Sequence, residues 1–133
     1  MRTPAVLLML ALLPTVARAE EQLAVVVRAG PHEATIVTRL KGQLADLDVV
    51  TLSVEATGDA IEPTLEAQLA AAERIGAASG ARVVVWFIPR GKTLAVAIAT
   101  PREHRLFVRE VPQSSDSATA EAAAITVRTA VRS

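Results

Sequence analysis

Few residues of this sequence combine the side-chain type and the spacing that acid–base or metal chemistry requires. The chain has two histidines, His32 and His104, and no cysteine. Neither histidine stands in an HxxE, HxxxH or HExxH spacing, so we predict no metal site. The best remaining catalytic candidates are His32 with the carboxylate of Glu33 or of Asp59, whose chemistry would be the general acid–base catalysis of a hydrolase.

Motifs for nucleophilic or phosphate chemistry are missing from the printed sequence. It contains no GxSxG elbow, no GxxxxGK[ST] phosphate loop and no GxGxxG after an apolar run. Gly76 and Gly80 stand close together, but at the end of an expected helix, where no helix N-terminus faces a phosphate. These features favour a protein that is not an enzyme and that uses no cofactor.

The N-terminus has the three parts of a secretory signal. Arg2 provides positive charge, residues 5–13 are apolar, and residues 17–19 hold the small side chains of a cleavage site. We predict a signal peptide over residues 1–19 and one mature domain over residues 20–133. The apolar run is far shorter than the roughly 20 residues that span a bilayer. Without cysteine the chain cannot be a lipoprotein, so we expect a periplasmic or secreted protein with no membrane insertion after cleavage.

The charge balance argues against nucleic acid as a partner. The precursor has 14 basic and 14 acidic residues. Removing Arg2 and Arg18 with the signal peptide leaves 12 basic against 14 acidic residues, a net charge of −2. Proteins that bind nucleic acids or anionic membranes need a basic excess or a basic patch.

Hydrophobic periodicity predicts the elements that must position these residues. The expected strands cover residues 23–28, 48–55, 82–89, 93–100 and 105–111, and the expected helices include residues 36–47, 65–75 and 118–131. This β-α-β-α-β-β-β-α order predicts a small single α/β domain with a mixed five-stranded sheet and helices packed on the sheet. Right-handed crossovers would make the first three strands parallel, and two tight turns would make the last three an antiparallel meander.

Trp86 and Phe87 are adjacent, which raises the question of an aromatic binding platform. Neighbouring strand residues point to opposite faces of a sheet, so the two rings cannot form one platform. Residues 83–88 are apolar at every position, as in a central strand that is covered on both faces. We therefore predict that both aromatic side chains belong to the core.

A rim of polar residues is expected beyond the C-terminal ends of the parallel strands. Open α/β sheets commonly bind ligands at this place. The candidate ligand-binding residues there are His32, Glu33, Glu55, Asp59, Arg90 and Lys92. The alternative is a solvated polar rim without a ligand, because every such sheet has one.

The last strand is the candidate surface for a protein partner. Alternation places Arg105, Phe107 and Arg109 on one face, and Leu106 and Val108 on the other. Charges on an edge strand discourage uncontrolled pairing, while the backbone stays open to a partner strand. Strand addition would use the main chain for affinity. The alternative is that the final helix or a neighbouring loop covers this edge.

The meander also carries a resemblance to known envelope proteins. Residues 80–111 read GARVVVWFIPRGKTLAVAIATPREHRLFVREV. This unit, with the strand–helix–strand–helix segment before it and the helix after it, resembles the TolB N-terminal domain and CsgG-like α/β modules. Those families often have an Ala-Asp-aromatic step where this chain has residues 81–83. The resemblance implies a non-catalytic module that binds other proteins, and it transfers no role to an individual residue.

Three functions remain open on this evidence. The favoured one is a non-enzymatic interaction or scaffold domain of the bacterial cell envelope, with other envelope proteins as partners. The second is a periplasmic domain that binds a small ligand at the polar rim. The third is the hydrolase based on His32.

Overall fold

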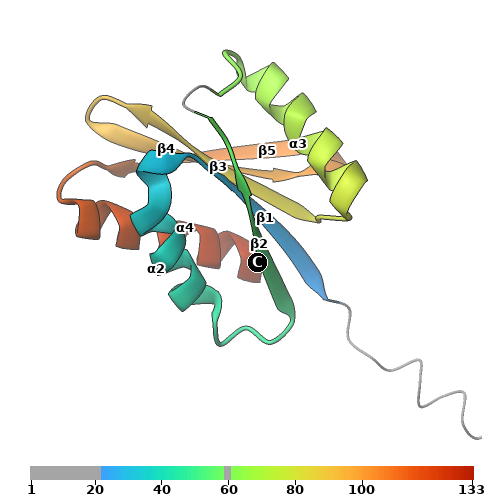
Figure 1. Cartoon of the computed structure of the whole chain (residues 1–133), viewed down its shortest axis with the longest axis horizontal. Helices are drawn as coiled ribbons and strands as arrows, with labels where there is room; N and C mark the ends of the chain where they lie inside the picture. Colours follow the sequence, from blue (N-terminus) through green and yellow to red (C-terminus); the bar gives the residue numbers. More distant parts are fainter. Residues whose placement is uncertain (1–21, 59–60) are drawn as a thin grey trace, which may run out of the picture.

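The computed structural model describes residues 22–58 and 61–133, so the predicted signal peptide and Asp59 lie outside the described residues. The strands are β1 (Leu23–Ala29), β2 (Val50–Ala56), β3 (Val83–Arg90), β4 (Thr93–Thr100) and β5 (Arg105–Pro112), and the helices are α2 (Ala34–Leu44), α3 (Leu65–Ser79) and α4 (Asp116–Arg132). Two 3-10 helices, η1 (Pro31–Glu33) and η2 (Pro101–Glu103), lie in the connections. Figure 1 shows this small α/β domain, which confirms the predicted fold class and order of elements.

The five strands form one mixed sheet in the order β2-β1-β3-β4-β5. Strand β1 pairs in parallel with both β2 and β3, whereas β3–β4 and β4–β5 are antiparallel. The predicted parallel set and meander are therefore confirmed. The order leaves β2 and β5 as the two edge strands.

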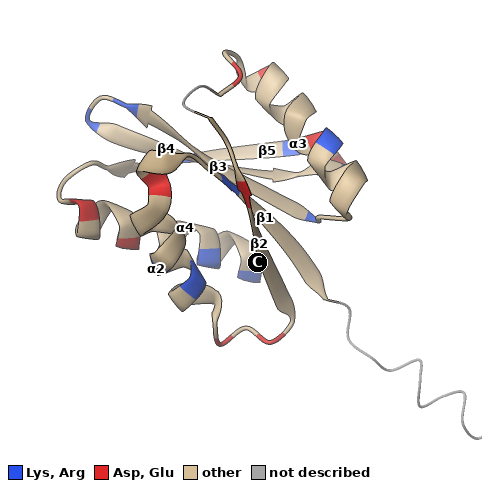
Figure 2. Ribbon diagram, viewed as in Figure 1, with Lys and Arg blue, Asp and Glu red and all other residues tan. Residues whose placement is uncertain are grey.

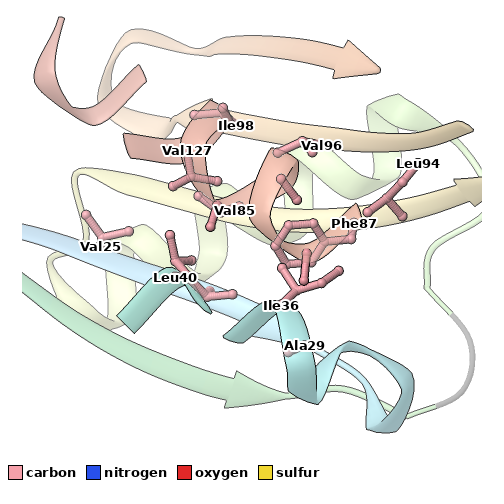
Figure 3. Close-up of a cluster of buried hydrophobic side chains, with 14 of the residues drawn as sticks. Val25, Ala29, Ile36, Leu40, Val85, Phe87, Leu94, Val96, Ile98 and Val127 are labelled. Carbon is pink, nitrogen blue, oxygen red and sulfur yellow. The ribbon is translucent and has the colours of Figure 1, made fainter. Parts of the chain in front are cut away.

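Helices cover both faces of the sheet. Helices α2 and α4 lie side by side on one face, and α3 lies on the other (Figure 1). The face under α2 and α4 holds the larger core, in which Leu40 of α2 and Val127 of α4 meet Val85 and Val96 of the central strands (Figure 3). All four side chains are fully buried. Burial of this apolar surface is the main driving force that fixes the two helices on the sheet.

The smaller core lies under α3 and contains Trp86. The Trp86 side chain is 0% exposed and packs with Ala72 of α3 and Ala97 of β4. Phe87 points into the other core and is also buried. Both aromatic rings are thus core residues on opposite faces, as predicted. The small residues opposite Trp86 leave room for the indole ring between the sheet and the helix.

Helix α3 approaches the β4–β5 connection closely at Gly76. A Cβ atom at this position would lie 3.0 Å from the Pro101 ring, so a larger residue would push η2 away. The helix ends at Ser79, and its C-cap residue Gly80 has the left-handed φ of 76° that favours glycine.

Several helix boundaries differ from the prediction, among them the end of α2 and the start of α4. Helix α2 ends at Leu44 and not at Leu47, because two successive turns follow, in which Leu47 N donates to Leu44 O at 3.0 Å and Val50 N donates to Leu47 O at 3.0 Å. Leu47 still packs against the larger core. The helical spacing of apolar residues therefore continues in the sequence beyond the last residue of the helix. Strand β2 accordingly begins at Val50.

Helix α4 begins at Asp116, two residues before the predicted start, and its N-cap is Ser115. The Ser115 hydroxyl accepts a hydrogen bond from Ala118 N at 3.1 Å. Figure 2 shows acidic residues at the start of α4 and basic residues toward its end, an arrangement that complements the helix dipole. Across the described parts of the chain, no helix is both long enough and apolar enough to cross a membrane.

Candidate functional site

The predicted rim forms a small crevice where β1, β2 and β3 end. His32 and Glu33 of η1 border it together with Thr57, which follows β2, and Phe87 of β3. Its volume is about 200 Å³, below the roughly 300–1,000 Å³ that is usual for small-molecule sites. The structure therefore brings two of the six predicted rim residues to one crevice.

The other rim residues that the structure describes, Glu55, Arg90 and Lys92, lie apart from this crevice. Glu55 points to the α3 face from the edge strand β2 and borders a separate hollow with Arg28 and Glu62. Arg90 and Lys92 lie at the exposed β3–β4 turn and border neither hollow. The five rim residues that the structure describes therefore do not form one binding set, which leaves the rim prediction without a converging group among these side chains.

The two rim residues at the crevice, His32 and Glu33, differ in their hydrogen bonding. The Glu33 carboxylate accepts a hydrogen bond from Gly30 N at 2.8 Å and so holds the turn that enters η1. His32 is exposed and has no hydrogen-bond partner among the described residues. No group of three or more histidine, cysteine or acidic side chains in residues 22–58 and 61–133 is placed to hold a metal ion. His104 lies elsewhere, in contact with Glu73 of α3.

A partly buried chain of polar contacts runs from β1 to β3 through α3. Arg28 donates two hydrogen bonds to the Glu62 carboxylate, at 3.1 and 3.3 Å. Gln68 donates to the Glu62 backbone oxygen at 2.9 Å and accepts from Trp86 Nε1 at 2.7 Å. The hydrogen bonds from Arg28 hold the pKa of the Glu62 carboxyl below its usual range. This chain of contacts satisfies the buried indole N–H and joins the loop before α3 to the sheet.

A groove opens on the other side of the molecule, between α4 and the outer strands. We call it the α4–β5 groove; it is bordered by Ile98 of β4, Phe107 and Arg109 of β5, and Ile125 and Thr129 of α4. Its volume is about 600 Å³. Phe107 and Ile125 are 48% and 46% exposed, so two large apolar side chains face solvent in the same groove. Exposed apolar groups that gather in one place are typical of interaction sites.

Strand β5 offers its backbone next to this groove. Gln113 N donates to Lys92 O at 2.8 Å, one position beyond the pair Thr93 and Pro112 with which the register of β4 and β5 begins. In an antiparallel ladder the bonded pairs alternate, so the residues two, four and six positions earlier on β5 also bond to β4. The N–H and C=O groups of Leu106, Val108 and Glu110 therefore face outward from the sheet.

The outer edge of β5 is uncovered by α4. The buried residues of the helix lie on the face of the sheet, where Ala123 and Val127 pack in the larger core. In the part of the chain that the structure describes, no strand pairs with the outer side of β5. Among the described residues, the sheet order therefore leaves β5 as an edge strand with no strand on its outer side.

Two arginines flank Phe107 on the groove face of β5, as the alternation predicted. Arg105 lies opposite Thr100, Phe107 opposite Ile98, and Arg109 opposite Val96. The Arg105 guanidinium is 5.9 Å from the centre of the Phe107 ring. Among the described residues, no carboxylate pairs with Arg105 or Arg109, in contrast to Arg28, Arg39 and Arg128. The groove face of β5 thus presents, on either side of an exposed aromatic ring, two arginines that have no salt bridge among the described residues.

The sequence placed Arg105, Phe107 and Arg109 on one face of the last strand, but it did not predict the groove wall from α4. Ile125 is the apolar residue of α4 that faces away from the core, and that exposure depends on where the helix lies on the sheet. It also missed Arg28 and Gln68. Arg28 could have been noticed as the one charged residue at the end of the apolar run LAVVVR. Gln68 could have been noticed as the one glutamine in the alanine-rich helix α3.

Comparison with known proteins gives no relative for this chain: no protein-family model, no curated protein and no solved structure matches it. The resemblance to TolB and CsgG modules therefore stays a prediction.

Proposed function

We propose that this protein is a non-enzymatic, exported interaction module of the bacterial cell envelope that binds a partner protein by strand addition at β5. The observation that carries the proposal is the open outer edge of β5 beside the α4–β5 groove. Edge addition supplies main-chain hydrogen bonds, and a neighbouring groove supplies selectivity for side chains. The rim crevice is smaller, and its acidic residue already holds a backbone N–H.

The proposed location rests on the sequence alone. The n-region, the apolar run and the small residues at 17–19 support export with a cleaved signal peptide. The resemblance of residues 80–111 to TolB-like and CsgG-like modules supports an envelope role, because those modules serve in assemblies of proteins.

Two proline substitutions test the proposal at the backbone. Val108→Pro removes an N–H that faces outward, so the β4–β5 ladder keeps its hydrogen bonds. Val54→Pro is the matched control on the opposite edge. Leu23 N donates to Val49 O and Thr57 N donates to Ala29 O, so the N–H of Val54 also faces outward, from β2.

The readout is site-specific photocrosslinking from position 107 in the native envelope. We expect one dominant crosslinked protein that is lost in Val108→Pro and retained in Val54→Pro. Thermal melts of the purified variants show whether both remain folded. If position 107 captures no protein, or if Val108→Pro captures the same protein to the same extent as the wild type, strand β5 is not the binding edge.

A further inference from the structure

We infer that the partner segment at β5 is an extended strand with an acid–apolar–apolar–apolar–acid pattern over five consecutive residues. This inference rests on the proposed strand addition and names the chemistry of the segment that binds. It follows from the side chains that a docked strand would meet on each face of β5.

The groove face determines the first, third and fifth residues of the segment. A strand docked on β5 places every second side chain directly opposite Arg105, Phe107 and Arg109. Oppositely charged cross-strand pairs are favourable and like-charged pairs are unfavourable. Because both arginines lack an ion-pair partner among the described residues, aspartate or glutamate fits opposite each of them.

The central residue of the segment lies beside the α4–β5 groove. Phe107 and Ile125 expose apolar surface there, and the groove has a volume of about 600 Å³. An apolar side chain opposite Phe107 would cover that surface and remove it from water. This position therefore calls for an aliphatic or aromatic residue.

The α3 face determines the second and fourth residues. Leu106 and Val108 alternate with the arginines and are half-buried on this face. Apolar side chains opposite them would extend the smaller core, to which Leu106 already belongs. The complete pattern reads the same in both directions, so it holds for a parallel and for an antiparallel segment.

A second copy of this chain fits the edge poorly. Antiparallel pairing of two β5 strands about Phe107 would place Arg105 of one copy opposite Arg109 of the other. Such like-charged pairs are unfavourable. In this register, the charge of the edge favours a different, acidic partner segment over a second copy of β5.

A selection from a displayed library of random linear peptides tests the inference on the full mature protein. Peptides that bind the wild type are counter-selected against Val108→Pro, with Val54→Pro as the folded control, and then sequenced. We expect enrichment of two acidic residues four positions apart around apolar residues. The Arg105→Glu/Arg109→Glu variant should enrich lysine or arginine at the same two positions.

Binding of synthetic peptides measures how much the two acidic residues contribute to affinity. Replacement of both acidic residues by glutamine should weaken binding roughly 2- to 30-fold, the range for the loss of two cross-strand charge pairs. Peptides that bind through β5 without acidic residues, or that bind equally well after this replacement, would overturn the inference while the strand addition stands. A Val108→Pro-sensitive dimer in sedimentation would overturn it in favour of a second copy. The absence of any Val108→Pro-sensitive peptide would overturn the strand addition itself.

Discussion

Trp86 and Phe107 lie in the same meander but have opposite environments. Trp86 is fully buried, and its indole N–H is satisfied by Gln68 Oε1 at 2.7 Å. Phe107 is 48% exposed. The Arg105 guanidinium lies 5.9 Å from the centre of its ring, and the ring borders the α4–β5 groove. A buried aromatic residue contributes mainly to stability, whereas an exposed one beside unpaired charges is available for binding.

Substitution of these two residues separates the roles. Trp86→Ala should lower the free energy of unfolding by roughly 3–5 kcal/mol, because it leaves a cavity and an unsatisfied Gln68. Phe107→Ala, the exposed aromatic control, should change it by about 0.5 kcal/mol or less. Denaturant melts of both variants give the comparison. A Trp86→Ala change of under about 1 kcal/mol would contradict the burial of this side chain.

At the same scale, the sequence predicted which aromatic residues are buried but not what they bond to. Continuous apolar residues around Trp86 indicated a covered strand. Its partner Gln68 lies 18 residues away on α3, and the contact depends on the rotation and position of that helix on the sheet. Local periodicity does not determine such long-range geometry.

At the scale of elements, the contact between Arg28 and Glu62 joins β1 to the loop before α3. The Glu62 carboxyl has a pKa below its usual range because Arg28 donates hydrogen bonds to its charged form. A lowered folded-state pKa contributes stability above the unfolded-state pKa, and that contribution is lost as the pH falls through the folded-state pKa.

Measurement of the free energy of unfolding at several acidic pH values tests the contact between Arg28 and Glu62. The free energy of unfolding of the wild type should fall as the pH is lowered from neutral into the acidic range of carboxyl titration. Glu62→Gln should be less stable than the wild type at neutral pH and should lose less stability on acidification. Asp46→Asn is a useful comparison, because Arg128 lowers the pKa of that exposed carboxyl through a surface pair. Parallel pH curves for wild type and Glu62→Gln would contradict the role of the Arg28 contact.

The packing of α4 on the sheet uses small side chains. Ala120, Ala123 and Ala124 are 0% exposed in the larger core beside α2. The sequence predicted the helix itself. It did not predict which face of the sheet α4 would cover. The helix is rich in alanine, and no side of it carries clearly larger apolar residues that would indicate what it packs against.

Overpacking of this helix has a defined expected cost. Ala124→Leu should destabilise the protein by roughly 1–3 kcal/mol, because a larger side chain would force α4 away from α2 and the sheet. Ala118→Leu introduces the same side chain at an exposed position of the first turn and should change stability by about 0.5 kcal/mol or less. Equal effects of the two substitutions in thermal or denaturant melts would show that Ala124 is not confined.

At the scale of the whole molecule, the strand order explains which surfaces are available. Strand β1 is apolar on both faces except at Arg28 and lies in the middle of the parallel set. Strand β2 has Thr51, Ser53 and Glu55 exposed on one face, which suits an edge. The order of the parallel strands was not predicted, because β3 could pair with β1 or with β2 under the same right-handed crossovers. The alternation in β2 was the usable signal, since one-sided polar strands are not covered on both faces.

Export of the molecule is the remaining expectation, and it belongs to the precursor and not to the folded domain. Cleavage after Ala19 would give a mature chain that begins at Glu20, because signal peptidase requires small residues at its subsites. Ala19→Phe should block processing and leave precursor in the membrane fraction, whereas Ala19→Ser should be processed like the wild type. Intact mass and N-terminal sequencing of the periplasmic fraction measure both results. A soluble cytoplasmic protein that retains Met1, or normal processing of Ala19→Phe, would contradict this cleavage site.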